Sequence, residues 1–353
     1  MKNFLSEKAR SLAPYTAGEQ PKDKRYIKLN TNENPYSPSP RALAALNTFK
    51  GDTLNLYPDP QAEELRKAIA LAEGVSPENV FCGNGSDEVL ALCFPAFFGE
   101  KESACFPAIT YSFYEVFARF FSVPVQTVSL KEEFYIDFDR LKGIGCRGYF
   151  IANPNAPTGA AVPLAEMERF IASVPDRLVI ADEAYMDFYG QSCAPLTRKY
   201  ENLLVVKTFS KSYSLAGMRC GYAVGCPSLI EGLFRMKDCF NSYPLDGICQ
   251  AVCRAAIEDR AYHEKTVRLV ISERVRLQAE LRALGFTVPE SGANFLFAGR
   301  TKLSGKEVYT RLKEEGVLVR FWDKPFLRDF CRITVGAREQ NDVLIEKLKQ
   351  ILS

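Results

Sequence analysis

The feature that most constrains the fold is an apolar run at residues 203–206 that leads directly into residues 207–219, a stretch rich in small and hydroxyl-bearing side chains. The run predicts a buried strand, and open α/β sheets bind ligands in the loops that follow such strands. Ser210 and Arg219 can bind a phosphate group, and Lys211, if it is desolvated, can react as an amine with a carbonyl group. Most lysines are exposed surface residues, so this stretch alone leaves both interpretations open.

Other apolar runs predict further strands of the same sheet, at about residues 79–82, 103–106, 148–152 and 178–181, with helices between them. The last of these runs is continuously apolar, which is typical of a parallel strand buried on both faces. The chain has 353 residues and exceeds the size at which single cores stop growing. We therefore expect an α/β fold with a large domain, built on a mostly parallel central sheet, and a smaller α+β domain.

The predicted elements divide the chain into three parts. Residues 1–35 are expected to form an N-terminal arm that packs with the small domain, and residues 36–245 the large domain. Residues 246–353 are expected to form the small domain, because longer helical patterns begin there. One of these helices is predicted at residues 264–284 and ends at a glycine.

Candidate functional residues follow the carboxyl ends of the predicted strands. Gly85 and Ser86 form a glycine turn in which Ser86 is expected to cap the next helix, and free amide groups at such a helix start can bind phosphate. Asp182 and Tyr185 follow a buried strand, where a carboxylate is costly without a cationic partner. An aromatic residue such as Tyr111 usually packs in the core, but its ring could instead lie against the face of a planar cofactor.

The composition argues against several classes of protein. A net charge of +2 gives no basic surface for nucleic acid or an anionic membrane. Eleven cysteines without a Cys-x-x-Cys pair indicate neither a zinc site nor a secreted disulfide framework, and we expect no metal. The first residues lack the apolar core of a signal peptide, and no run is long enough to cross a bilayer, so we expect a cytoplasmic protein. The single histidine, His263, is expected on a solvated helix face, which leaves acid–base chemistry to lysine, tyrosine or carboxylates.

Together these residues resemble the fold-type I pyridoxal-phosphate aminotransferases and, within them, the histidinol-phosphate aminotransferase family. The resemblance extends over nearly the whole chain. The segments that carry it are residues 12–15, 29–35, 57–58, 83–88, 153–159, 182–185, 208–221, 318–320 and 332–336. The motifs around Lys211 and Asp182 are specific to the superfamily, whereas the N-terminal arm and the late arginines Arg320 and Arg332 favour this member.

The resemblance implies a role for each candidate residue, with pyridoxal 5'-phosphate as the cofactor. Lys211 would be the Schiff-base lysine and the general acid–base catalyst, Asp182 would pair with the ring nitrogen, and Tyr185 would contact the phenolic oxygen. Tyr111 would stack on the ring. Further cofactor-binding residues would be Gly85, Ser86, Asp87, Ser210, Arg219 and, from the neighbouring subunit of a homodimer, Tyr57. The substrate-binding residues would be Tyr15, Asn32, Arg320 and Arg332.

One position departs from the family pattern. The family often has asparagine immediately before Pro-Thr-Gly, where its amide meets the phenolic oxygen, and this chain has Ala156. Either Asn155 takes that role, or Tyr185 acts alone.

The implied reaction transfers an amino group from histidinol phosphate to 2-oxoglutarate, giving imidazole-acetol phosphate and glutamate, a step of histidine biosynthesis. Threonine-phosphate decarboxylase and an aromatic amino acid aminotransferase, which share this fold, stay open as alternatives. A cofactor-binding regulator of the same fold is disfavoured, because the chain has neither room nor a basic patch for a DNA-binding domain.

Overall fold

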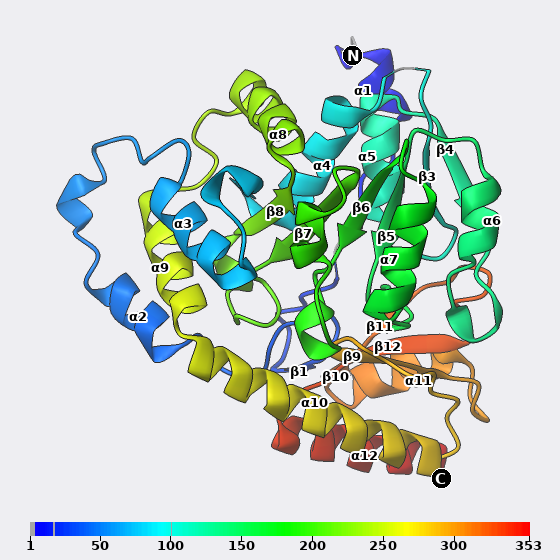
Figure 1. Cartoon of the computed structure of the whole chain (residues 1–353). Helices are drawn as coiled ribbons and strands as arrows, with labels where there is room; N and C mark the ends of the chain where they lie inside the picture. The colour runs from blue at the N-terminus through cyan, green and yellow to red at the C-terminus, as the bar shows by residue number, and fades with distance from the viewer. Residues whose placement is uncertain (1–3, 17, 100) are drawn as a thin grey trace.

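The computed structural model describes residues 4–16, 18–99 and 101–353 (Figure 1). Its large domain is built on a seven-stranded sheet with the strand order β2-β8-β7-β6-β5-β3-β4. The strands are β2 (Val80–Gly83), β3 (Ala104–Pro107), β4 (Val125–Val128), β5 (Gly148–Ala152), β6 (Leu178–Asp182), β7 (Leu203–Thr208) and β8 (Gly221–Gly225). The neighbours from β7 to β4 pair in parallel, whereas β8 is antiparallel to β2 and β7. The expected mostly parallel sheet is confirmed.

Helices cover both faces of this sheet, which explains why its strands are apolar on both sides. One face packs against α3 (Glu63–Glu73), α6 (Phe138–Gly143), α7 (Leu164–Ser173) and α9 (Gly247–Glu258). The other face packs against α4 (Gly85–Phe97), α5 (Phe113–Phe121) and α8 (Pro227–Phe240). Two further helices, α1 (Glu7–Ser11) and α2 (Pro40–Asn47), lie outside these layers, and α2 packs on α9.

The small domain lies below the sheet in the view of Figure 1. Its three-stranded antiparallel sheet has the order β11-β12-β9, with β11 (Arg320–Phe321), β12 (Phe330–Thr334) and β9 (Phe295–Gly299). Its helices are α10 (Arg260–Ala283), α11 (Gly305–Glu314) and α12 (Arg338–Leu352). In the N-terminal arm, β1 (Ile27–Lys28) pairs in parallel with β10 (Val317–Leu318), so this part of the arm is attached to the small domain.

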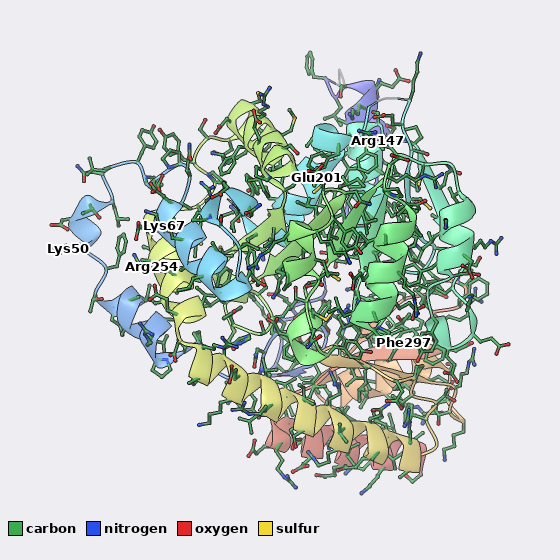
Figure 2. All side chains as sticks on the ribbon, in the orientation of Figure 1. Lys50, Lys67, Arg147, Glu201, Arg254 and Phe297 are labelled. Carbon is green, nitrogen blue, oxygen red and sulfur yellow. The ribbon has the colours of Figure 1, made fainter. Side chains whose placement is uncertain are left out.

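Aromatic rings join the two domains. Phe297 of β9, labelled in Figure 2, stacks on Phe330 at 4.5 Å between ring centroids. It also meets Phe134 of the large domain edge-on at 5.5 Å. Such aromatic pairs stabilise a contact by about 1 kcal/mol beyond the area they bury. They fix the small domain beside the ends of the large-domain strands.

Along the chain, α9 is the last helix that packs in the core of the central sheet, and α10 contributes to the core of the small domain. The apolar face of α9 belongs to the same core as the central sheet, and its outer residue Arg254 pairs with Glu64 of α3 at 3.0 Å (Figure 2). The boundary predicted at residue 246 lies just before α9 and stays a prediction. The sequence pattern does not show which core α9 packs against, because α9 has the same helical periodicity as the helices of the small domain.

Several predicted elements differ in detail from the structure. The strands β4 and β8 are not among the predicted ones: in β4 polar residues interrupt the apolar ones, and the three apolar residues of β8 stand between two glycines. Residues 286–288 form a single bridge, Thr287 to Gly299, rather than a strand. The helix α4 begins at Gly85 with Asn84 as its N-cap, so Ser86 lies in the first turn and the predicted cap is wrong. Among the described residues, no helix is long and apolar enough to cross a membrane.

Candidate active site

A cavity of about 290 Å³ opens at the carboxyl ends of β5, β6 and β7 and is also lined by the N-terminal arm and the small domain. Most of the residues singled out from the sequence meet there, although they come from segments far apart in the chain. Those that line it are Tyr15, Asn32, Ser86, Asp87, Tyr111, Asp182, Tyr185, Ser210, Lys211, Arg219, Arg320 and Arg332.

Lys211 follows β7 and is held at the cavity by the N-terminal arm. Its Nζ donates a hydrogen bond to the carbonyl oxygen of Thr31 at 3.3 Å and lies 5.7 Å from the ring centroid of Tyr185. The Nδ2 of Asn34 donates to the backbone carbonyl of Lys211 at 3.1 Å. The amine therefore faces the cavity, where it can react with a carbonyl compound. Among the described residues no carboxylate forms an ion pair with it; the carboxylate of Glu33, which pairs with Lys28 at 2.6 Å, interacts with it electrostatically.

Asp182, at the end of β6, is 5% exposed. Its Oδ2 accepts a hydrogen bond from the hydroxyl of Tyr114 at 2.6 Å, and its Oδ1 accepts one from the amide of Ala184 at 3.2 Å. Burial raises the pKa of Asp182 to about 6, although both hydrogen bonds act in the opposite direction. In the described part of the chain, no cationic side chain pairs with this acid, so its position fits a cationic group of a bound ligand.

This burial predicts how the stability of the ligand-free protein depends on pH. Because the folded-state pKa of Asp182, about 6, lies above the ordinary value of 3.8, ionising it costs folding free energy as pH rises through that interval. We expect Asp182→Asn, which cannot ionise, to gain up to about 3 kcal/mol relative to the wild type between pH 4 and pH 7. Urea unfolding of both proteins across this range measures the difference, and the same substitution at the exposed Asp323 should show none. A difference that does not change with pH would contradict the assignment.

One end of the cavity is built to receive a phosphate group. Arg219 has a left-handed backbone (φ 52°) and its guanidinium lies 3.2 Å from Asp87 Oδ2. A Cβ atom on Gly85 (φ +79°) would lie 2.6 Å from that guanidinium, and one on Gly221 would lie 2.3 Å from the amide nitrogen of Ser86. The two glycines thus let Arg219 and the first turn of α4 approach each other, with the free amides of the helix start beside them.

The opposite end is lined by the arm and the small domain. The hydroxyl of Tyr185 accepts a hydrogen bond from Asn32 Nδ2 at 2.9 Å. Arg332 donates through Nη2 to the carbonyl of Asn30 at 3.0 Å, but its buried Nε has no hydrogen-bond partner. Burial lowers the pKa of Arg332. Because an unpaired buried donor is costly, this position fits an anionic group of a substrate.

The aromatic residues of the cavity are also positioned by neighbours. Tyr111 donates its hydroxyl hydrogen to Asp87 Oδ1 at 2.8 Å, and burial, with Asp87, raises its pKa well above the ordinary value. Tyr15 stacks on Phe113 with 4.2 Å between ring centroids. Tyr114, which holds Asp182, was not singled out from the sequence, because its contact joins residues 68 positions apart.

Three predicted residues do not line the cavity. Gly85 acts through the space it leaves for Arg219. Asn155 is fully buried, its Nδ2 donates to Ile109 O and Thr158 Oγ1 at 3.0 Å, and its Oδ1 accepts from Thr110. Ala156 lines the cavity in its place, which leaves Tyr185 as the candidate partner of a phenolic oxygen. Tyr57 lies outside the cavity, 83% exposed.

The expectation that His263 is solvated is wrong. Its ring stacks on Tyr213 at 4.2 Å, and its Nε2 lies 3.3 Å from Asp187 Oδ2. Asp187 also accepts a hydrogen bond from Ser212 at 2.5 Å and pairs with Lys207 at 3.3 Å. Burial acts to raise the pKa of Asp187, but Lys207 and His263 outweigh it and hold the pKa well below the usual range. This charged group fixes Ser212, next to Lys211.

Comparison with known proteins gives one family and many relatives. The family described as aminotransferase class I and II matches residues 24–348. The histidinol-phosphate aminotransferase of Brachyspira hyodysenteriae is 46% identical over 353 residues, covering 100% of this chain and 99% of the relative. Histidinol-phosphate aminotransferase 1 of Bordetella parapertussis is 48% identical over 355 residues, covering 100% of each.

Solved structures share the fold. The crystal structure of histidinol-phosphate aminotransferase from Sinorhizobium meliloti, in complex with pyridoxal-5'-phosphate, superposes with a TM-score of 0.89 at 22% identity. It covers 100% of this chain and 98% of its own. The enzyme of the same name from Clostridium acetobutylicum superposes with a TM-score of 0.85 at 23% identity, covering 92% of this chain and 98% of its own.

Proposed function

Because the chain belongs to the class I and II aminotransferase family, we propose that it is a pyridoxal-phosphate-dependent aminotransferase that converts histidinol phosphate and 2-oxoglutarate to imidazole-acetol phosphate and glutamate. The substrate is supported by relatives 46% and 48% identical over the full length. The chemistry is supported by one observation above all: among the described residues, a lysine that forms no ion pair and a buried acid that pairs with no cation line the same cavity.

The residues present fit the cofactor. Ser86, Ser210, Arg219 and the free amides of the α4 start would hold its phosphate, Tyr111 its ring face, and Asp182 its ring nitrogen. Lys211 would hold its aldehyde carbon. When bound, the cofactor supplies an electron sink for the pair of electrons released when the substrate loses its Cα proton.

The protein residues supply the rest of the reaction. With the cofactor bound, Lys211 Nζ would take the Cα proton of the substrate and later give a proton back, so one amine would act as base and then as acid. Asp182 would place its negative charge beside the ring nitrogen and so favour a proton there. Tyr185, hydrogen-bonded to Asn32, is positioned to donate to the phenolic oxygen. No histidine is required, and His263 is not among the residues that line the cavity.

The two arginines of the small domain support substrates with an anionic end. We expect Arg332→Ala to raise the KM for histidinol phosphate and for glutamate by roughly tenfold to a hundredfold, the effect of losing a hydrogen bond to a charged group, with little change in kcat. Steady-state kinetics with both substrates measure this. Arg300→Ala, an exposed arginine of the same domain, is the matched control. Unchanged KM values for both substrates would remove Arg332 from the binding site.

The substrate assignment is tested by half-reactions. The cofactor-loaded protein is mixed separately with histidinol phosphate, threonine phosphate and phenylalanine, and its visible absorbance is followed. We expect histidinol phosphate to convert the aldehyde form of the cofactor to the amine form fastest. Release of carbon dioxide from threonine phosphate without amine formation, or faster conversion by phenylalanine, would assign the alternative activity.

A homodimer is the proposed assembly. Apolar side chains are exposed on the segment that projects from the large domain between α2 and α3 and near the end of α8 (Figure 1): Leu54 (60%), Leu56 (67%), Tyr57 (83%) and Phe240 (80%). Exposed apolar surface of this kind supports an interface with another chain. Tyr57, stacked on Tyr243 at 4.7 Å, would then reach the phosphate in the cavity of the neighbouring subunit.

A hybrid dimer tests this arrangement. Tyr57→Ala and Lys211→Ala homodimers are each expected to be impaired. A hybrid with one subunit of each kind should recover one working site, because the subunit with an intact Lys211 then receives an intact Tyr57 from its partner. Recovery to roughly half of the wild-type rate per dimer is expected. No recovery would place Tyr57 in its own subunit's site or outside both.

A reducing, cytoplasmic location is also proposed. It is supported by the eleven cysteines, all of which are free thiols in the structure.

A further inference from the structure

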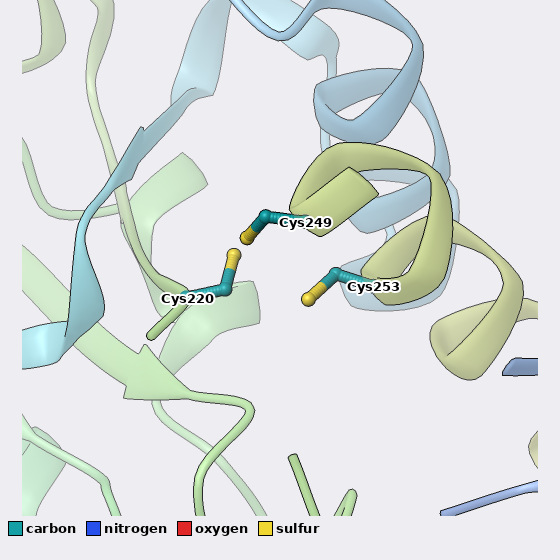
Figure 3. A group of neighbouring side chains, drawn as sticks. All are labelled: Cys220, Cys249 and Cys253. Atoms are coloured by element: carbon teal, nitrogen blue, oxygen red, sulfur yellow. The ribbon is translucent and has the colours of Figure 1, made fainter. Parts of the chain in front are cut away.

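Three cysteines outside the active-site cavity bring their sulfur atoms together in the core of the large domain. Cys220 immediately precedes β8, and Cys249 and Cys253 lie one turn apart on α9. Figure 3 shows the three side chains directed into the space between strand and helix. Their Sγ atoms all lie within 4.8 Å of one another, and all three residues are fully buried.

The spacing of the sulfur atoms fits a single bound ion. An ion bonded to three thiolates at about 2.3 Å, a length typical of metal–thiolate bonds, needs sulfur separations of about 3.4 Å if the site is pyramidal and about 4 Å if it is planar. Cys249 and Cys253 are four residues apart, so they face the same side of α9, and Cys220 completes a triangle from the sheet. Three soft sulfur ligands favour thiophilic ions over the hard ions that oxygen ligands select.

The apolar residues around the three cysteines favour an ion whose charge balances three thiolates. The cluster lies in the apolar core with Phe209, Leu215, Leu245 and Val252. The charged side chain that acts on Cys249 is the anionic Asp246, whereas other thiols act on Cys220 and Cys253. Three thiolates around a divalent ion would leave a net negative charge in this core, which is costly. Around a trivalent ion the complex is neutral.

We propose that Cys220, Cys249 and Cys253 form a binding site for a soft trivalent ion, for which arsenite is the probe. In the reaction with arsenite, three S–H bonds and three As–O bonds break, three As–S bonds form, and the three protons leave with the three hydroxyl groups as water. The oxidation states of arsenic and sulfur do not change, so no oxidant or reductant is needed.

The site is joined to the turn that carries Arg219. Cys249 Sγ donates a hydrogen bond to the carbonyl of Met218 at 3.2 Å, and the carbonyl of Cys220 accepts one from the amide of Phe209 at 3.0 Å. Arg219 therefore lies between two residues that contact or belong to the cluster. Drawing the three sulfur atoms to a common ion shifts this turn, and binding of the ion should weaken retention of the cofactor phosphate, an effect that rests on the proposed function.

X-ray absorption at the arsenic edge tests the site in the cofactor-loaded protein treated with arsenite. We expect one arsenic per chain with three sulfur neighbours and no oxygen neighbour. Cys253→Ser should leave two sulfur neighbours and weaken binding at least about tenfold. Cys239→Ser, at an exposed cysteine, should change neither the number of sulfur neighbours nor the affinity. Fewer than three sulfur neighbours in the wild type, or tighter binding of Cd²⁺ than of arsenite, would overturn the proposal, whatever the stability of the variants.

Retention of the cofactor tests the link to Arg219. Arsenite is expected to speed cofactor release about tenfold in the wild type, within the usual range of coupling between two sites, and to have no such effect in Cys253→Ser. Unchanged release from an enzyme with three sulfur neighbours on arsenic would overturn the link. A protein that binds arsenic through three sulfur atoms but takes up no cofactor would instead refute the proposed function, because the thiol site does not depend on it.

Discussion

Lys211→Ala is expected to abolish the visible absorbance of the cofactor-loaded protein and to lower turnover by at least about 10⁴-fold. The substitution removes the amine that is proposed both to hold the aldehyde carbon and to move the proton. Absorbance spectra and single-turnover rates with histidinol phosphate measure the two effects. Because the substitution removes the hydrogen bond from Nζ to Thr31 O but no ion pair among the described residues, the fold should remain intact.

Two controls separate this role from a structural one. Lys199→Ala, at an exposed lysine that pairs with Glu168, should keep both colour and turnover. Methylamine added to Lys211→Ala should restore part of the turnover, because a free amine can then carry the proton. Turnover within tenfold of the wild type without added amine would show that Lys211 is not the acid–base group.

Asp182→Asn is expected to lower turnover by roughly 10³-fold while the protein still binds the cofactor through Lys211. Asparagine keeps the size of the side chain but carries no negative charge, so it no longer holds a proton on the ring nitrogen. Asp182→Glu, which keeps the charge, should retain more turnover than Asp182→Asn. Stopped-flow measurement of proton loss from the substrate Cα gives the rate directly, and an unchanged rate in Asp182→Asn would make this acid structural.

The adjacent Glu183 offers a matched control. It is also buried, and burial raises its pKa to about 7, with Lys207 acting in the opposite direction. Its oxygens, however, accept hydrogen bonds from the amide of Cys193 at 2.7 Å and from Ser192, away from the cavity. Glu183→Gln should therefore change the free energy of unfolding but leave the rate of proton transfer nearly unchanged. Equal effects of the two substitutions on that rate would contradict a specific role for Asp182.

The parts of the site that could be predicted are those that depend on short, continuous sequence patterns. The apolar runs of β6 and β7 predict both strands. They also predict that Asp182 and Lys211 lie at the carboxyl ends of these strands. Parallel strands then bring their carboxyl ends to one edge of the sheet. The cavity there contains both residues.

The parts that could not be predicted depend on contacts between distant segments. The pairing of Tyr114 with Asp182 and the burial of His263 between Tyr213 and Asp187 leave no mark in local periodicity. Asn155 has the right residue type for a cofactor contact, but its amide is used by its own loop and by the segment around residue 110. The same holds for α9, whose place in the large-domain core follows from packing.

Reduction of the cofactor-loaded protein with borohydride, followed by peptide mass mapping, tests the central claim most directly. The reduced cofactor should remain covalently attached to the peptide that contains Lys211, in a one-to-one ratio with the chain. Attachment to a different lysine, such as Lys207, or recovery of a peptide map without any attached cofactor, would contradict the account.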